Sequence, residues 1–156
     1  MLKVKSASCG TFLYLLRFYL ILWHFLDNEI TIYLAGGSVM KMTLKDTSEF
    51  YSGTGFPTVY QGSASGKYPF YKVGDISKNV QQGYKFLEIC DNYIDDDILK
   101  QIKGVLIPKN SIAFAKIGEA LKLNRRAITK QDCLVDNNAV AICPNQAILD
   151  VDYSSP

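Results

Sequence analysis

Few residues of this chain have the types and spacing that catalysis or metal binding requires. The 156 residues include one histidine, His24, inside an apolar run, and four cysteines, at positions 9, 90, 133 and 143, with no C-x-x-C pair. Zinc sites need clustered ligands, and Ser-His-Asp or Cys-His arrangements need a suitably placed histidine. We therefore expect no catalytic residues, no metal site and no cofactor, and we interpret the scattered thiols as reduced core side chains.

Two further motifs that could bind ligands have simpler structural interpretations. The Gly-Thr-Gly motif at 53–55 lacks the Lys-Ser/Thr ending of a phosphate-binding loop and the third glycine of a dinucleotide-binding turn, so it indicates a turn. Three consecutive acids at 95–97 could suggest a metal site, but they would point in different directions around a helix start. Helix capping, with Asp95 as the cap, explains them better.

The strongest chemical signal is an uneven distribution of charge. The whole chain has 17 basic and 15 acidic residues, a net charge of +2, which indicates no particular partner. Between positions 100 and 130, however, eight basic residues stand against one acid, Glu119, so this segment alone has a net charge of +7. Its basic residues are Lys100, Lys103, Lys109, Lys116, Lys122, Arg125, Arg126 and Lys130.

The basic segment could bind the phosphates of a nucleic acid. If it forms strands, its apolar side chains alternate toward the core and its basic ones project from strand ends and loops. The expected core residues are Ile112, Phe114, Leu121 and Leu123. Projecting cations would neutralise phosphates, and an arginine could make two hydrogen bonds to a guanine edge. Tyrosines at 51, 60, 68 and 71 add polar aromatic groups, although an ordinary solvated face explains the same charges.

Short strands and a few helices are predicted to position these residues. Strands are predicted at 30–34, 39–44, 68–73, 105–107, 112–117, 121–128, 133–135 and 139–143, separated by turn residues. A helix is predicted over Asp95–Ile102, where isoleucines recur every four residues, and Gly104 would end it. The fold class is therefore α+β, with mostly short antiparallel strands and two or three helices.

Residues 12–26, FLYLLRFYLILWHFL, are predicted to form an apolar helix. A helix of 15 residues is about 22 Å long, shorter than the roughly 30 Å hydrocarbon core of a bilayer, and Arg17 lies within it. A signal peptide is an alternative, since Lys3 and Lys5 precede the run and small residues follow it. We expect a buried or partner-packed helix in a cytoplasmic protein that does not contact a membrane.

Four sequence blocks occur in order between residues 46 and 149. They are SGTGFP (52–57), YPFYKVGDIS (68–77), LIPKNSIAFAKIGEALKLNRRAI (106–128) and DNNAVAICP (136–144). Together they resemble one target recognition domain of the DNA-specificity (S) subunit of type I restriction-modification systems. The resemblance implies the fold of that domain and sequence-specific DNA binding, in which the domain reads one half of a bipartite site.

The resemblance also implies the partners. Specificity subunits carry no catalysis themselves but hold modification (methyltransferase) subunits, which bind S-adenosylmethionine and recruit the restriction subunit. The chain is therefore expected to be a non-catalytic DNA-recognition subunit of a restriction-modification enzyme complex. Its implied partners are double-stranded DNA, the modification subunits and, through them, the restriction subunit.

The sequence departs from the family in its organisation. A complete specificity subunit has two such domains separated by long helices, whereas this sequence resembles one domain and shows no heptad-bearing helix. FLYLLR (12–17) and GGSVMKMTLKD (36–46) resemble the segment that closes a recognition domain, yet here they precede its opening. We expect this segment in residues 1–45 and the main body of the domain in 46–156, either circularly permuted or joined after a deletion.

The residues expected to contact DNA combine the basic segment with residues of the preceding loops. They are Tyr60, Lys67, Tyr68, Lys72, Lys116, Lys122, Arg125 and Arg126. Gly74 and Asp75 are expected to shape a turn instead, because an acid near phosphates is repulsive unless it accepts from a cytosine amine. An alternative function is a truncated specificity fragment that acts as a non-catalytic protein-interaction module, through the apolar helix, with a homodimer as one form.

Overall fold

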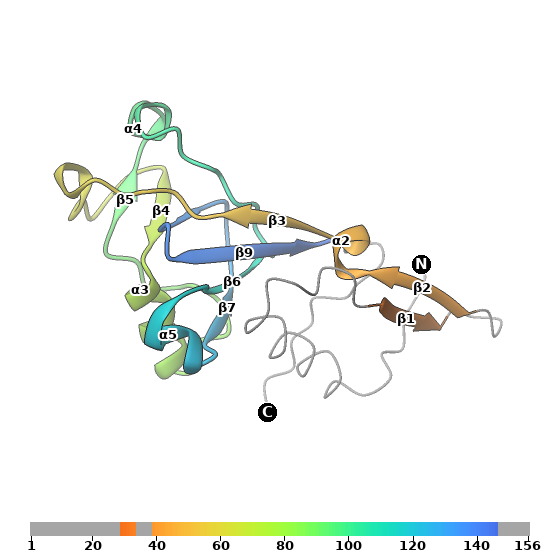
Figure 1. The fold of residues 1–156 in the computed structure, drawn as a ribbon. Helices are drawn as coiled ribbons and strands as arrows, with labels where there is room; N and C mark the ends of the chain where they lie inside the picture. Colours follow the sequence, from red (N-terminus) through yellow and green to blue (C-terminus); the bar gives the residue numbers. More distant parts are fainter. Residues whose placement is uncertain (1–28, 34–38, 147–156) are drawn as a thin grey trace. The chain divides into compact units, whose positions relative to one another are not determined.

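A computed structural model describes residues 29–33 and 39–146, so the predicted apolar helix at 12–26 lies outside the described residues (Figure 1). The strands are β1 (Glu29–Tyr33), β2 (Val39–Thr43), β3 (Ser48–Ser52), β4 (Tyr68–Tyr71), β5 (Tyr93–Ile94), β6 (Ile112–Ala115), β7 (Arg126–Ile128), β8 (Leu134–Val135) and β9 (Ala139–Pro144). The helices are α2 (Leu44–Thr47), α3 (Val73–Gln81), α4 (Asp96–Gln101) and α5 (Gly118–Lys122), with a 3-10 turn η1 (Thr58–Tyr60).

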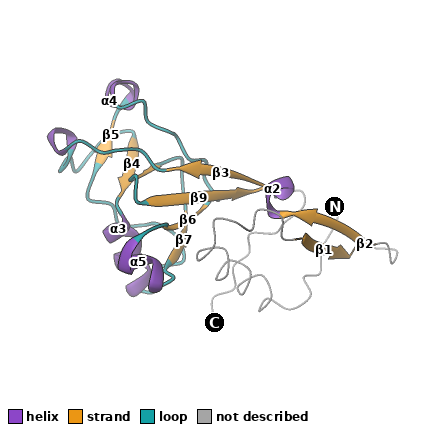
Figure 2. Cartoon of the chain, in the orientation of Figure 1, coloured by secondary structure: helices purple, strands orange, loops and turns teal. Residues whose placement is uncertain are grey.

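The predicted fold class is confirmed. The protein is α+β, with short strands and short helices (Figure 2). The described strands form a two-stranded sheet β1-β2, a four-stranded sheet in the order β3-β9-β6-β7 and a three-stranded sheet in the order β5-β4-β8. Most of the pairings given between them are antiparallel, and β4 with β8 is a parallel pair.

Contacts divide the chain into two units. The described part of the first is 29–33, 39–49 and 144–146, and that of the second is 50–143. In the first unit β1 and β2 form an antiparallel hairpin, and Thr43 begins α2. The Thr43 hydroxyl accepts the Asp46 N–H at 3.2 Å while the Asp46 carboxylate accepts the Thr43 N–H at 2.9 Å. This reciprocal capping fixes the helix start. The division predicted at residue 45 stays a prediction.

Strand β6 is central in the four-stranded sheet and is buried along its whole length. It pairs antiparallel with β7, where Phe114 faces Arg126, and with β9, where Ala113 faces Ala141. Helices α3 and α5 both contact it. The sequence Ile-Ala-Phe-Ala suits such a strand, because the alanines leave room for close neighbours on one face. Ile112 and Phe114 are 5% exposed each, as predicted for core residues.

The three-stranded sheet is packed against α4. Phe70, Ile94 and Leu134 are buried at its centre, and the apolar side of α4 contributes Ile98 and Leu99 to this cluster. Phe56, from the loop after β3, stacks on Phe70 with ring centroids 3.8 Å apart. Figure 1 shows α4 at one end of the second unit and α3 and α5 at the other. The two ends of this unit are therefore built on different sheets.

Asp95 occupies the N-cap position of helix α4, as predicted, and the helix begins at Asp96, but the predicted side-chain cap is absent. No hydrogen bond joins the Asp95 side chain to the first turn; its Oδ1 accepts the Lys67 N–H at 2.9 Å instead. The helix ends at Gln101, and the chain turns away at Lys103, with φ 50°, and at Gly104, whose N–H donates to the Leu99 carbonyl. Asp95 therefore binds the preceding loop, while Asp96 and Asp97 lie in the first turn of α4, where negative charge interacts favourably with the helix dipole.

Three local predictions are wrong. The strand predicted at 105–107 does not form, and Ile107 makes only an isolated bridge with Cys133. The strand predicted at 121–128 does not form at its start, because residues 118–122 form helix α5. Gly118 (φ 74°) and Asn124 (φ 49°) take left-handed conformations at the two ends of this helix. Strand alternation therefore fails, and Leu123 is 54% exposed rather than in the core. Gly74 and Asp75 lie in the first turn of α3 rather than in a separate turn, since Asp75 accepts the Lys72 N–H at 2.8 Å.

The turn between β8 and β9 connects the two sheets of the second unit. The Asp136 N–H donates to the Tyr71 carbonyl of β4 at 3.0 Å, and the Asp136 Oδ2 accepts the Val73 N–H of α3 at 3.2 Å. Thr54, after β3, donates its N–H to Val135 at 2.9 Å. The Lys116 N–H, after β6, donates to Asn138 at 2.9 Å. We call residues 136–138 the junction turn.

Among the described residues, no helix is long and apolar enough to cross a membrane.

We predict that Gly53→Ala destabilises the protein strongly while Gly55→Ala does not. A Cβ at Gly53 would lie 1.8 Å from the Asp136 carbonyl oxygen and 2.9 Å from that of Ala139, and both are backbone atoms that cannot turn away. At Gly55 nothing lies within 4 Å. Chemical denaturation should show a loss of about 3 kcal/mol or more for Gly53→Ala. Equal stability of the two variants would contradict the close approach at the junction turn.

Candidate nucleic-acid interface

The structure divides the eight predicted contact residues into two groups. Helix α3 has nine residues and is therefore about 13 Å long. Lys72 and Lys116 lie near its N-terminal end, and they are grouped here with Tyr60, Lys67 and Tyr68 of the preceding loop, which contact α4. Near the C-terminal end of α3 lie Lys122, Arg125 and Arg126. The first group is called the loop group here and the second the α5 group.

Three residues of the loop group contact side chains of the first and last residues of α4. The Tyr60 hydroxyl donates to the Gln101 Oε1 at 2.6 Å. The Lys67 Nζ forms an ion pair with Asp96 at 2.7 Å, and the Tyr68 hydroxyl donates to the same carboxylate at 3.1 Å. The Lys67 Nζ also lies 4.9 Å from the centre of the Tyr68 ring. These contacts hold the loop between β3 and β4 against α4.

The charge of Lys67 is compensated in this arrangement. The hydrogen bond to Asp96 raises the pKa of Lys67 above its usual value, and the same bond lowers the pKa of Asp96. Both side chains are about half exposed, 53% and 51%. Exposed ion pairs contribute little to stability and exchange readily with other ionic partners. Lys67 therefore reaches a phosphate only by giving up Asp96.

Lys72 joins the loop to the start of α3. Its Nζ donates to the Gln61 Oε1 and lies 6.0 Å from the centre of the Phe56 ring. Its own N–H donates to Asp75, which is buried against α3. Lys72 is half-buried, so it orders the loop as well as adding positive charge near the surface.

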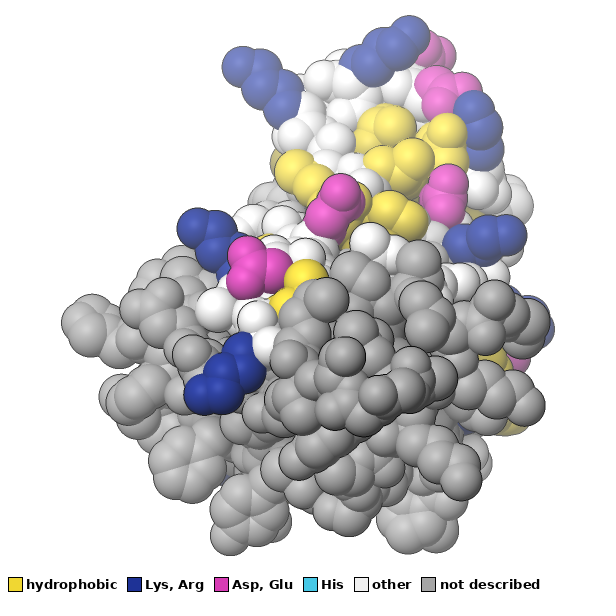
Figure 3. All heavy atoms as spheres, turned by 90° about the vertical axis from the view of Figure 1, so that its right-hand side faces the viewer, with side chains coloured by type: hydrophobic (Ala, Val, Ile, Leu, Met, Phe, Trp, Pro, Cys, Tyr) yellow, Lys and Arg dark blue, Asp and Glu magenta, His cyan; other side chains and the backbone are white. Residues whose placement is uncertain are grey.

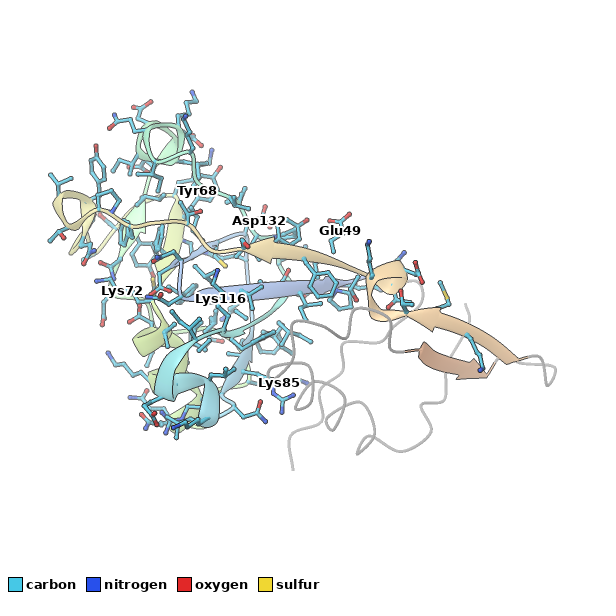
Figure 4. All side chains as sticks on the ribbon, viewed as in Figure 1. Glu49, Tyr68, Lys72, Lys85, Lys116 and Asp132 are labelled. Atoms are coloured by element: carbon cyan, nitrogen blue, oxygen red, sulfur yellow. The ribbon has the colours of Figure 1, made fainter. Side chains whose placement is uncertain are left out.

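Lys116 lies beside the junction turn. It follows β6 directly, is half-buried and is held by the hydrogen bond from its N–H to Asn138. Figure 4 shows the labelled Lys116 and Lys72 on the same side of the second unit, which agrees with the bond from Val73 to the same turn. Among the described residues Lys116 makes no ion pair with an acid. Its charge is therefore available to an anionic ligand.

The α5 group has three cations, as the loop group does, and they lie within five residues of one another in the sequence, close to Lys116 of the loop group. Lys122 pairs with Glu119 at 2.7 Å across one turn of α5, with both side chains largely exposed. The guanidinium of Arg125 donates to the Gln81 amide oxygen at 2.8 and 3.1 Å, with that amide oriented by its hydrogen bonds. Arg126 is the first residue of β7 and faces Phe114 across the ladder. From 116 to 126 four cations stand against one acid.

The other cations of the basic segment lie elsewhere. Lys130 pairs with Glu88 at 2.7 Å, Lys100 lies in α4, and Lys103 follows it. In the upper part of Figure 3, basic side chains are separated from one another, with acidic side chains and an apolar group between them. By their positions in the fold, the cations between residues 100 and 130 are spread over several elements and do not all lie beside α5.

Several residues that organise this surface were missed by sequence reasoning. Gln61 and Gln81 each accept a hydrogen bond from a predicted cation, and Asp96 pairs with Lys67. Asp136 was predicted only as part of a turn, yet it caps α3 from 63 residues away. No local signal identifies such long-range partners, because neutral amides and turn acids are common on any surface.

The described cysteines do not form a metal or disulfide site. Cys90, Cys133 and Cys143 are free, and no cluster of ligands among the described residues could hold a metal ion. Cys133 is fully buried, and the Cys90 thiol donates to the Asn92 carbonyl at 2.9 Å. Burial raises the pKa of Cys90 to about 11 and raises that of Cys133 further. Such thiols are inert core groups at neutral pH.

The fold is similar to that of one known subunit. No protein-family model matches the sequence, and no curated protein matches it. Among solved structures, the chain matches the crystal structure of the HsdS subunit from Thermoanaerobacter tengcongensis with a TM-score of 0.53. The match covers 88% of this chain and 30% of that one, at 9% sequence identity. The likeness is one of fold. The chain thus spans less than a third of the length of that subunit.

We predict that Asp75→Asn removes a pH-dependent cost to stability. Burial raises the pKa of Asp75 in the folded protein, so its ionised form is disfavoured there relative to the unfolded chain. The contribution of Asp75 to the free energy of unfolding is therefore most favourable below the usual pKa of aspartate. It is lost as the pH rises through the raised pKa of Asp75 in the folded protein. An asparagine still accepts the Lys72 N–H but does not ionise.

Urea denaturation at a series of pH values tests the direction of this pH dependence of stability. The stability of the variant relative to the parent protein should increase as the pH rises above about 4. A parent protein that gains stability over the variant along the same pH series would contradict the prediction.

Proposed function

We propose that this chain is a DNA target recognition domain of type I specificity-subunit type, which binds double-stranded DNA and reads one half of a bipartite site. HsdS is the specificity subunit of type I restriction-modification systems, and the fold of this chain is similar to part of one. The proposed role is recognition only. Catalysis would reside in modification and restriction subunits, and the proposed place of action is the cytoplasm.

The observation that carries the proposal is the meeting of the four family-like blocks at the junction turn. Gly53 and Thr54 come from the first block, Tyr71 and Val73 from the second, Lys116 from the third, and the turn itself begins the fourth. Each block contacts residues 135–139 through a hydrogen bond or belongs to that segment. The blocks that carry the sequence resemblance thus form one structural unit.

Electrostatics support the proposal at the α5 end. The cations between 116 and 126 face one acid, and Lys122 and Glu119 are both largely exposed. Phosphates can displace such a carboxylate, because an exposed pair is weakly held. Arginine also offers the fork that matches a guanine edge in the major groove. The loop group would bind less strongly, since the Lys67–Asp96 pair is less exposed than the Lys122–Glu119 pair and Tyr68 contacts both of its members.

The second candidate is a truncated specificity fragment that acts as a protein-interaction module. The observation that favours it is the coverage, since the match spans 30% of the HsdS subunit. A chain that corresponds to part of such a subunit would depend on a modification subunit, or on a second copy of itself, to complete a bipartite reader.

We predict that Arg125→Ala with Arg126→Ala weakens binding to every duplex and flattens its salt dependence. Removing phosphate contacts reduces the slope of log K against log salt by about one unit per contact. The matched control is Lys100→Ala with Lys130→Ala, which removes the same charge from α4 and from the Glu88 pair. Fluorescence anisotropy at several salt concentrations measures both. Equal slopes for the two double variants would refute the assignment of the α5 group.

Arg126 is half-buried, so stability needs a separate readout. Arg125→Ala alone keeps β7 intact and should show part of the same effect. A melting temperature close to that of the parent protein would exclude unfolding as the cause of weaker binding.

We predict that selection from a random duplex library yields a consensus for the full chain. The selection is run with the chain alone and with a modification subunit. A consensus from the chain alone supports an independent reader, and a consensus that needs the partner supports a half-subunit. The absence of any consensus under both conditions would contradict sequence-specific recognition and favour the interaction module.

A further inference from the structure

Two exposed apolar side chains flank α5. Ile117 is the residue before the helix and is 53% exposed, and Leu123 is the residue after it and is 54% exposed. Large apolar side chains with half of their surface in water form no part of the core. Their exposure therefore has no explanation in the packing of the described residues.

The backbone holds both side chains in defined positions. Ile117 is extended and is followed by Gly118 in a left-handed conformation, which turns the chain from β6 into the helix. Leu123 is followed by Asn124, also left-handed, whose N–H donates to the Leu121 carbonyl at 3.0 Å. Ile117 and Leu123 are therefore held at the two ends of α5.

The surroundings of this pair are basic. Lys116 precedes Ile117, Lys122 precedes Leu123, and Arg125 follows two residues later. Val59 is the most exposed large apolar side chain among the described residues, at 79%, but it lies in a loop that carries no charged residue between 54 and 66. That loop is bonded to α4, where three consecutive acids lie. A polyanion is therefore favoured at Ile117 and Leu123 and not at Val59.

We propose that Ile117 and Leu123 make apolar contacts to DNA bases, beside cations that bind the flanking phosphates. This inference rests on the proposed function and adds the residues that contribute to specificity. Cation contacts to phosphates fix the protein on the duplex but carry no sequence information, whereas apolar contacts to a thymine methyl group do. Ile117 and Leu123 are the apolar side chains that the α5 segment presents beside those cations.

The test compares Ile117→Ala with Leu123→Ala against the control Val59→Ala. Fluorescence anisotropy measures the Kd of the full-length chain, with the modification subunit where selection required it, for the selected duplex and for a scrambled one. The double variant should bind the selected duplex about tenfold more weakly. Its affinity for the scrambled duplex, its salt slope and its melting temperature should stay unchanged, and Val59→Ala should behave as the parent protein.

A second measurement identifies the contacted group. Deoxyuridine, which lacks the thymine methyl group, replaces thymidine at each position of the selected duplex in turn. At the contacted positions the replacement should weaken the parent protein and leave the double variant unaffected. The same loss in both proteins would contradict a methyl contact by these side chains.

The remaining outcomes separate this inference from the proposed function. If the parent protein selects a duplex and the double variant binds both duplexes as the parent does, only this inference fails. If the double variant loses affinity for both duplexes equally, its effect is not sequence-specific and the inference also fails. If the double variant instead loses binding to the modification subunit alone, these side chains belong to a protein interface. A parent protein that binds no duplex overturns the function and the inference together.

Discussion

The structure of the second unit depends on hydrogen bonds at the turn between β8 and β9. Asp136 is the central residue, since its N–H binds β4, its carboxylate caps α3 and its carbonyl accepts the Ala139 N–H. The strand that precedes it belongs to the three-stranded sheet, and the strand that follows it belongs to the four-stranded sheet. The three-residue turn thus joins two sheets and orients the helix between them. Gly53 approaches it so closely that no side chain fits there.

This constraint explains how the surface is arranged. Lys72 lies at the start of α3 and Lys116 at the end of β6, and both segments are bonded to the junction turn. Further along α3, Gln81 holds Arg125 near α5. The helix therefore separates an ordered loop, bonded to α4, from a basic segment around α5. Asn79, buried in α3, fixes the segment 88–89 to this helix through three hydrogen bonds of its side chain, and a fourth joins that side chain to the Asp75 carbonyl within α3.

Much of the fold could be predicted from local sequence, but the surface could not. The strands at β4, β6 and β9 were predicted because apolar and β-branched residues end at clear turn signals. The stretch after Ile117 was assigned wrongly, since Leu121 and Leu123 fit strand alternation equally well and only the left-handed Gly118 and Asn124 decide for a short helix. The density of charge was visible in the sequence. Its division between two ends of α3 depends on partners such as Asp96 and Gln81, which lie far away in sequence.

The surface proposed to meet DNA consists of residues 116–126 and the junction turn. Hydrogen-deuterium exchange of the backbone amides, with and without a duplex, tests this assignment directly. A duplex bound there should protect residues 116–126 and the junction turn, with little change in α4. Protection confined to α4 and the loop before β4, or no protection anywhere in the presence of a selected duplex, would contradict it.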